Sequence, residues 1–219
     1  MNKLKMYCIC LHDRNYSAVK KLGYIPVGLG KEIFSEGWLK DNQGENISEK
    51  NKYYGEYTFH YWFWKNKIDQ IENGTWIGFC AYRRFWLNNK KIVSTPNENN
   101  FLVNIPEEWN NYDTILGQQF FINKMKLSKL IKHGLRSLLN HPSAIFEKNR
   151  NIKFHFNSFH GFGKLDKAID LLNDEDREDF RKFTEQNVSY NIGNMFVCKS
   201  KKIINDYYNS VFPWLKRCE

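Results

Sequence analysis

The feature that most constrains the fold is a near-continuous apolar run that ends in two arginines. Residues 75–82 read TWIGFCAY, and Arg83 and Arg84 follow directly. A strand that is apolar on both faces is typical of the interior of a parallel sheet, where helices cover both sides. The run therefore predicts a central strand whose carboxyl end carries positive charge.

Strand-like and helical segments alternate along the chain, which predicts an α/β fold. We expect a mostly parallel sheet flanked by helices, in a single domain over residues 1–219, of which residues 120–190 form a mostly helical portion. Besides the run above, the patterns predict strands over residues 5–13, 24–30, 111–117 and 191–199, and helices over residues 52–66, 124–140, 174–186 and 201–212.

The predicted helix 52–66 is unusually aromatic. Tyr54, Tyr57 and Tyr61 keep helical spacing, which predicts a bulky packing face. Gly55 lowers helix stability by about 1 kcal/mol relative to alanine, and its small size leaves room for a loop or a ligand. The last helix is predicted to end before Pro213.

Polar residues gather where three of the expected strands end. They are the pair His12 and Asp13, the triplet Tyr82, Arg83 and Arg84, and Asp113. Ligands of α/β folds bind outside the carboxyl ends of the strands. These strand ends are therefore the best candidate site that the sequence offers.

The arginine pair has two interpretations. A guanidinium presents a rigid fork that suits phosphate oxygens and stays charged at any working pH. At a strand end, Arg83 and Arg84 would hold a diphosphate and stabilise a leaving group. Equally, one arginine would pair with a structural carboxylate while the other faces water.

The polar segment DNQGENIS, residues 41–48, precedes the aromatic helix. Asp, Asn and Ser at a helix start bind a base, a ribose or a phosphate, but turn formation and capping explain the same residues without a ligand. We expect Gly44 to be left-handed and Ser48 to cap the helix, with Glu49 in its first turn.

Three residues are candidates for acid–base chemistry: Glu56 on the aromatic helix, Asp113 at the end of its strand, and His160 in the glycine-containing loop HGFG. The acidic run at 174–176 belongs to a charged helix start, and no Asp-x-Asp follows a strand, so we expect no metal site. The sequence also lacks a P-loop, GxGxxG and GxSxG, which argues against NTPases, dinucleotide enzymes and hydrolases.

The cysteines, the apolar runs and the net charge predict where the protein is found and what kind of partner it binds. The five cysteines have no zinc-type spacing and lie mostly in apolar runs, so buried reduced thiols in a cytoplasmic protein are expected. The apolar stretch near Met1 is too short for a signal peptide and no run reaches about 20 apolar residues, so we expect neither a signal peptide nor a membrane-spanning helix. The net charge of +9 favours anionic partners.

Three motifs in order give the chain a family resemblance. They are DNQGENISEKN, then EYTFHYWFWKN, then IGFCAYRRF, and a late NMFVCK agrees with them. The sequence resembles bacterial capsular and exopolysaccharide glycosyltransferases, which are catalogued as the domain-of-unknown-function-4422 family. The resemblance extends over nearly the whole chain.

This resemblance implies a GT-A-like, Rossmann-like fold that transfers a sugar from a UDP-sugar, with galactofuranose as one candidate, to a growing surface glycan or a lipid-linked saccharide. Residues 120–190 would lie on the acceptor side. Residues that it assigns to the donor are Asp41, Asn42, Asn46, Ser48, Asn51, Tyr82, Arg83 and Arg84, and those on the sugar or acceptor side are Tyr57, Trp64 and Asn194. The strand-end pair His12 and Asp13 is added to the donor side because of its position and not because of the resemblance.

One departure from the family pattern affects the mechanism. Relatives carry a histidine before Tyr-Arg-Arg, where this chain has Ala81, so the role of that histidine is either absent here or supplied by another residue, with His160 as the candidate. We predict a metal-independent enzyme that needs no cofactor, with arginines in place of the usual cation; the alternative is a divalent ion at the diphosphate.

Two other classes fit some of the same residues. A nucleic-acid-binding α/β module would use the positive charge and the interleaved aromatics, but the chain has no RNP-like or OB-like motif, so we expect no nucleic-acid partner. A catalytically inactive relative that scaffolds polysaccharide assembly would tolerate Ala81.

Basic residues are concentrated in the predicted helix 124–140 and just before it. A solvated helix face explains them, and so does peripheral contact with an anionic bilayer on the inner face of the cell membrane. The residues in question are Lys124, Lys126, Lys129, Lys132 and Arg136.

Overall fold

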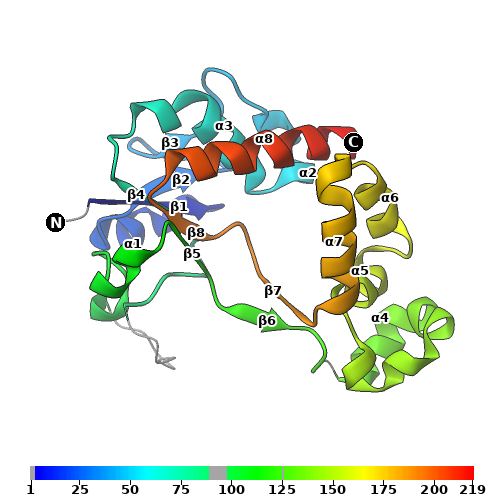
Figure 1. The fold of residues 1–219 in the computed structure, drawn as a ribbon. Coiled ribbons are helices and arrows are strands. Elements are labelled where there is room, and N and C mark those ends of the chain that lie inside the picture. Colours follow the sequence, from blue (N-terminus) through cyan, green and yellow to red (C-terminus); the bar gives the residue numbers. More distant parts are fainter. Residues whose placement is uncertain (1–2, 89–97, 125) are drawn as a thin grey trace. The chain divides into compact units, whose positions relative to one another are not determined.

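The computed structural model describes residues 3–88, 98–124 and 126–219 (Figure 1). The chain divides into two compact units. Unit 1 comprises residues 1–117 and 193–209, and unit 2 comprises residues 118–192 and 210–219. The helical portion predicted at 120–190 lies inside unit 2.

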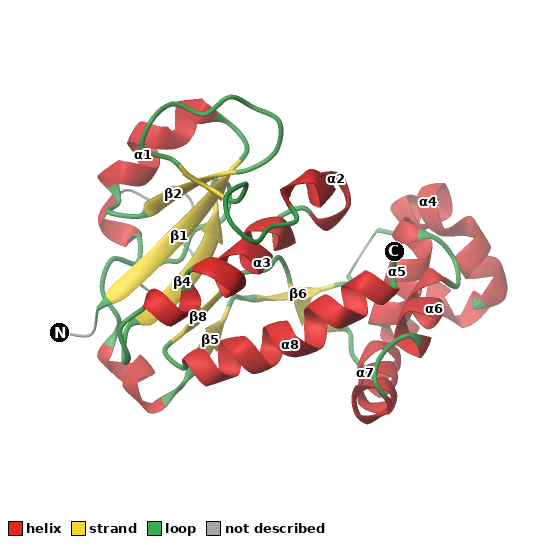
Figure 2. Ribbon diagram, turned by 90° about the horizontal axis from the view of Figure 1, so that it is seen from above, coloured by secondary structure: helices red, strands yellow, loops and turns green. Residues whose placement is uncertain are grey.

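Unit 1 is built on a six-stranded sheet in the order β3-β2-β1-β4-β8-β5 (Figure 2). The first four strands run parallel, β8 is antiparallel to both of its neighbours, and β5 therefore points the same way as β4. The predicted α/β fold with a mostly parallel sheet is confirmed. The strands are β1 Leu4–Cys10, β2 Ile25–Gly28, β3 Leu39–Lys40, β4 Trp76–Ala81, β5 Thr114–Leu116 and β8 Phe196–Cys198.

Alternation along β1 directs side chains to two separate cores. Met6 and Cys8 join Val19 of α1, Tyr16–Lys21, in one buried cluster. Tyr7 points the other way and packs on Phe63 of α3, Tyr57–Asn66, with ring centroids 5.2 Å apart. Successive side chains of a strand point to opposite faces of the sheet. Because those of β1 pack on α1 on one side and on α3 on the other, the sheet has helices on both faces.

The aromatic helix departs from its prediction in two ways. It is broken into α2, Asn51–Tyr54, and α3, because Gly55 has φ +54, which a helix does not tolerate. A Cβ at Gly55 would meet nothing within 4 Å, so the glycine serves the backbone turn and not a close approach. The buried face carries Phe59, Trp62 and Phe63, whereas the three predicted tyrosines are only partly buried.

Unit 2 is mostly helical. Its short strands β6, Gln119–Phe121, and β7, Ser189–Asn191, pair with each other. The predicted strand 191–199 is thus wrong in its extent: Gly193, with φ +76, separates β7 from β8. The helices of unit 2 are α4 Leu127–Asn140, kinked at Gly134, α5 Ile152–His160, α6 Lys164–Asp170 and α7 Asp174–Gln186.

The last helix, α8, spans Lys201–Arg217 and passes through Pro213, where the sequence predicted its end. The turns after the proline are held within unit 2, because Trp214 Nε1 donates to the Ala168 carbonyl at 2.6 Å and Arg217 Nε to that of Leu171 at 2.7 Å. These contacts offset the backbone hydrogen bond that the proline cannot make.

Four of the five cysteines, Cys8, Cys10, Cys80 and Cys198, are buried and all five are unpaired, as the sequence predicted.

Candidate functional site

The carboxyl ends of β1 and β4 lie side by side in unit 1, because the two strands are parallel neighbours paired from Leu4 and Trp76 to Ile9 and Ala81. Their polar ends meet: the rings of His12 and Tyr82 stand edge to face, with centroids 6.1 Å apart. The predicted convergence of these two strand ends is confirmed.

A tight turn sets the direction of the arginines. The Arg84 N–H donates to the Ala81 carbonyl at 2.8 Å, and the Ala81 N–H donates back at 3.2 Å. Tyr82 is tied to β1 through the Ile9 carbonyl at 3.0 Å, and the Arg83 guanidinium stacks 4.9 Å from the Tyr82 ring centroid. Both arginines are exposed, and among the described residues no carboxylate oxygen lies within 4.0 Å of either guanidinium.

Arg84 nevertheless faces a carboxylate, that of Glu56, at the start of α3. Burial raises the pKa of Glu56, while the charge of Arg84 and a hydrogen bond from the Asn194 backbone work in the opposite direction. A carboxyl group with a raised pKa beside a cation is a suitable proton acceptor near neutral pH. The structure brings together Glu56, Arg84 and Asn194, three residues that the sequence assigned separately.

Gly193 makes this approach possible. A Cβ at this glycine would lie 3.3 Å from Nη1 of Arg84, and its φ of +76 is one that other residues rarely adopt. Sequence reasoning missed Gly193, although a glycine directly before the Asn194 motif was a usable signal.

His12 and Asp13 hold a loop in place. His12 Nδ1 lies 2.7 Å from the Glu32 carboxylate, and Asp13 Oδ1 accepts from both the backbone N–H and the hydroxyl of Ser35 at 2.8 Å. These Ser35 bonds lower the pKa of Asp13, and the Asp13 backbone and His12 lower that of Glu32. Glu32 and Ser35 lie about 20 positions further along the chain than His12 and Asp13, and no local sequence pattern marked them.

Asp41 follows β3 and is buried, at 4% exposure. Its Oδ2 has no hydrogen-bond partner among the residues that the structure describes, which is rare for a buried carboxylate. Burial raises the pKa of Asp41, opposed by the Thr58 hydroxyl. Asn51 Nδ2 donates to that same hydroxyl at 3.2 Å, so Asp41, Asn51 and Thr58 form one cluster.

The rest of the polar segment builds its own turn. Asn46 Oδ1 accepts from the Ser48 hydroxyl at 2.9 Å, and Asn46 Nδ2 donates to the Gly44 carbonyl at 2.8 Å. Gly44 is left-handed, as predicted, but Ser48 is the first residue of a 3₁₀ turn, preceded by Ile47, and not its cap. Turn formation accounts for Asn46 and Ser48, and Asn42 is exposed.

The two aromatic candidates differ in position. The Tyr57 hydroxyl lies 2.6 Å from that of Tyr207, next to Glu56, and burial raises its pKa. Trp64 is eight residues beyond Glu56, about 12 Å along the helix, and packs on Tyr208, with its ring 3.7 Å from Lys65 Nζ. The structure therefore groups Tyr57 with the strand ends and Trp64 with the helix packing.

Asp113 lies at the opposite edge of the sheet. It precedes β5 instead of ending it, so it stands at the amino edge, where its carboxylate is 3.7 Å from Lys199 Nζ. The expectation that Asp113 ends a strand is wrong, because the strand begins one residue later.

His160 is the last residue of α5 in unit 2, exposed and followed by Gly161 with φ +112. It contacts the Phe156 ring at 4.9 Å, and its catalytic role stays a prediction.

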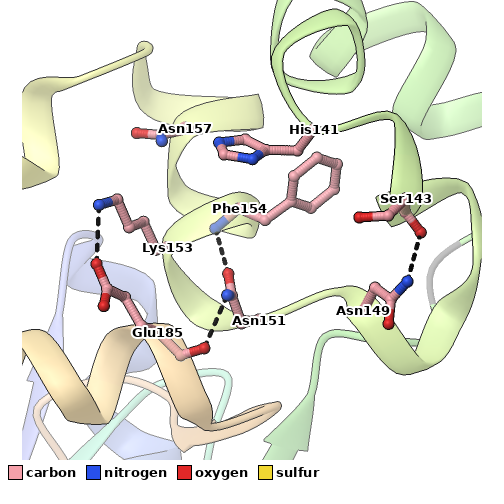
Figure 3. Close-up of a pocket in the computed structure, with 8 residues that line it drawn as sticks. All are labelled: His141, Ser143, Asn149, Asn151, Lys153, Phe154, Asn157 and Glu185. Carbon is pink, nitrogen blue, oxygen red and sulfur yellow. Dashed lines mark hydrogen bonds and ion pairs between the residues drawn. The ribbon is translucent and has the colours of Figure 1, made fainter.

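Unit 2 contains a cavity of about 320 Å³ whose lining residues are mostly of polar types (Figure 3). Its groups are mostly bonded to one another: Lys153 to Glu185 at 3.0 Å, and Asn151 to the Phe154 N–H and the Glu185 carbonyl, both at 2.8 Å. The cavity contains none of the predicted site residues. Its lining residues are His141, Ser143, Asn149, Asn151, Lys153, Phe154, Asn157 and Glu185.

Within the described ranges, no three His, Cys, Asp or Glu side chains are grouped as a metal site. In the same ranges, no helix is both long and apolar enough to cross a bilayer.

Comparisons with known proteins find a matching family and a similar solved structure. The family described as "Domain of unknown function (DUF4422)" matches residues 5–219. The apo structure of the WbbM bifunctional glycosyltransferase is similar, with a TM-score of 0.60 and 21% identity over 99% of this chain. This likeness shows the fold, and the chain spans 37% of that protein's length. No curated protein matches the sequence.

Proposed function

Because the chain belongs to the DUF4422 family, and its fold is that of a region of a bacterial glycosyltransferase, we propose that it is a nucleotide-sugar-dependent glycosyltransferase of GT-A-like type. Its donor is a UDP-sugar, with galactofuranose as one candidate sugar. Its acceptor is a growing capsular or exopolysaccharide chain or a lipid-linked saccharide, reached from the cytoplasm.

The observation that carries the proposal is that the Glu56 carboxyl group faces Arg84, without contact, at the carboxyl edge of the sheet. Glycosyl transfer releases a nucleoside diphosphate, and Arg84, together with Arg83 on the same turn, supplies forked donors for it without a carboxylate already in contact. In a transfer that inverts the anomeric centre, Glu56 accepts the proton of the attacking acceptor hydroxyl, and its raised pKa suits that role.

The nucleoside side of the donor is assigned to Asp41. Its unpartnered Oδ2 is an acceptor for a ribose hydroxyl or a base N–H, and Asn51 and Thr58 hold the cluster around it. His12 and Asp13 act by fixing the loop that carries Glu32 and Ser35.

The test is a thermal-shift panel of UDP, UDP-glucose, UDP-galactose, UDP-galactofuranose and the matching GDP compounds. A ligand that binds the folded state raises Tm by mass action. We expect stabilisation by UDP compounds alone, followed by sugar release from one UDP-sugar in EDTA. Activity abolished by EDTA and restored by manganese would overturn the metal-independent part. UDP binding without any turnover would favour the inactive scaffold, and salt-sensitive oligonucleotide binding without a UDP response would favour the nucleic-acid module.

A further inference from the structure

We propose that α4 and the turn that follows it form a docking surface for an anionic lipid bilayer. This inference goes beyond the proposed glycosyl transfer, and it concerns unit 2 alone.

The surface is apolar where a protein in water would be polar. Leu127 and Ile131 are exposed one turn apart before the kink in α4, and Leu135 and Leu139 one turn apart after it, Leu139 at 73%. In the turn after the helix, Ile145 and Phe146 are exposed at 51% and 64%. Single exposed apolar residues are ordinary, but six in 20 positions mark an interaction site.

These side chains are exposed because α4 is held by another face. Leu130 and Leu138 of α4 are buried with Ala144 and Phe154 in a cluster of their own. At Gly134 the helix approaches α5 so closely that a Cβ would lie 2.7 Å from the Ser158 hydroxyl oxygen. The exposed face is therefore presented by a packed helix and not by a frayed one.

Arg150 fixes the turn that carries Ile145 and Phe146. It is 3% exposed, and its guanidinium donates to the carbonyls of Ala144 at 2.9 Å, Ile145 at 2.8 Å and Asn123 at 2.9 Å. The segment before α4 and the turn after it are thus both hydrogen-bonded to one buried cation. Because these bonds fix the turn in the folded protein, holding Phe146 exposed costs little additional conformational entropy.

Charge identifies the occupant. The stretch from Lys124 to Lys148 has one acidic residue, Glu147, against six basic ones. An amphipathic helix with lysines beside its apolar face lies in the plane of a bilayer with anionic lipids. Nucleic acid is less suited, because single strands stack on aromatic rings, whereas this face is mostly Leu and Ile. The six basic residues are Lys124, Lys126, Lys129, Lys132, Arg136 and Lys148.

The experiment is flotation of the whole chain with vesicles of phosphatidylcholine alone or with one quarter phosphatidylglycerol. We expect binding to the anionic vesicles that weakens with salt. Leu139→Ser with Phe146→Ser lowers the partition coefficient by roughly tenfold or more, because two exposed apolar groups no longer enter the bilayer. Lys129→Glu with Lys132→Glu lowers it by at least roughly 30-fold on anionic vesicles only, because two attractive charges are lost and two repulsive ones are gained.

Matched controls separate the surface from general charge and apolarity. Val103→Ser with Tyr112→Ser removes exposed apolar groups of unit 1, and Lys167→Glu with Lys216→Glu reverses charges elsewhere in unit 2. Because all these positions are exposed, circular dichroism should show each variant folded.

Three results would overturn the proposal. They are no flotation of the unaltered chain with anionic vesicles, equal loss in a control pair, and a dimer in solution that the Leu139 and Phe146 changes dissociate, since a second copy would then cover this face. UDP binding is measured without vesicles, so failure here leaves the proposed function standing.

Discussion

Arg84 and Arg150 have the same side chain in opposite surroundings. Arg84 is exposed at a strand end of unit 1, facing Glu56 with no carboxylate oxygen within 4.0 Å among the described residues. Arg150 is buried in unit 2 and donates to three backbone carbonyls. The Arg84 guanidinium can donate hydrogen bonds to a ligand, whereas that of Arg150 donates to the backbone and stabilises the fold.

The role of each arginine follows from what its hydrogen-bond donors already bind. A buried cation without partners is costly, so Arg150 is stable only with its carbonyls. An exposed cation costs little to keep in water, and its strength appears when a phosphate replaces that water. Substitution of Arg84 should therefore change ligand affinity, and substitution of Arg150 should change stability.

The largest effect is expected at the carboxylate that Arg84 faces. Glu56→Gln should lower the transfer rate by roughly a thousandfold, because a general base contributes about that much. Burial raises the pKa of Glu56, so the rate of the unaltered enzyme should rise with pH as the carboxyl loses its proton, with a midpoint above the usual glutamate range.

The measurement is kcat/KM against pH with the donor found in the panel. The Gln variant should lose that ascending limb, whereas Glu49→Gln, an exposed change in the same segment, should keep it. An unchanged pH profile in Glu56→Gln would exclude Glu56 as the base.

Arg150→Met tests the structural half of the comparison. Three carbonyls lose a charged donor, which should lower the free energy of unfolding of unit 2 by about 3 kcal/mol. Hydrogen exchange of the α4 amides should accelerate by roughly 100-fold, while UDP affinity stays the same. Arg136→Met, which removes a guanidinium 5.2 Å from the Phe162 ring, is the control and should change exchange little. Equal exchange in both variants would contradict the assignment.

Sequence reasoning identified Arg84 and not Arg150, and the reason is local. Arg84 follows an apolar strand, and a strand end is visible as a change in pattern. Arg150 lies in a basic stretch where any one cation resembles a solvated one, and its burial depends on carbonyls up to 27 positions away. The same limit hid Glu32 and Ser35, whereas the parallel sheet followed from apolar runs alone.

Arg84→Met tests the functional half. UDP affinity should fall by roughly 10- to 100-fold, the value of one or two charge-assisted hydrogen bonds, and the urea midpoint should not move. Calorimetry with UDP gives the affinity, and Arg14→Met, an exposed change near the same edge, serves as the control. A stability loss like that of Arg150→Met would show that Arg84 is structural.

The errors in the predicted elements arise because the spacing of hydrophobic residues reports neither backbone dihedral angles and exact strand ends nor tertiary contacts. Gly55 breaks the aromatic helix because of its φ, and Asp113 falls at the wrong end of a strand that is four residues shorter than the apolar run suggested. Pro213 stays inside α8 because tertiary contacts of Trp214 and Arg217 outweigh a local signal.

The smallest effect, and the sharpest comparison, is expected from Gly193→Ala. Its φ of +76 should cost about 1 kcal/mol of stability in any L-residue other than glycine, and the new Cβ would stand 3.3 Å from Arg84 Nη1. Gly74 has nearly the same φ, +79, with nothing within 4 Å of its Cβ position, so Gly74→Ala carries the backbone cost alone. Both variants should therefore lose the same stability in urea, while only Gly193→Ala weakens UDP binding, by a few-fold, because the guanidinium must shift by a few tenths of an ångström. Equal UDP affinity in the two variants would show that the close approach of Arg84 to Gly193 does not position the guanidinium for the diphosphate.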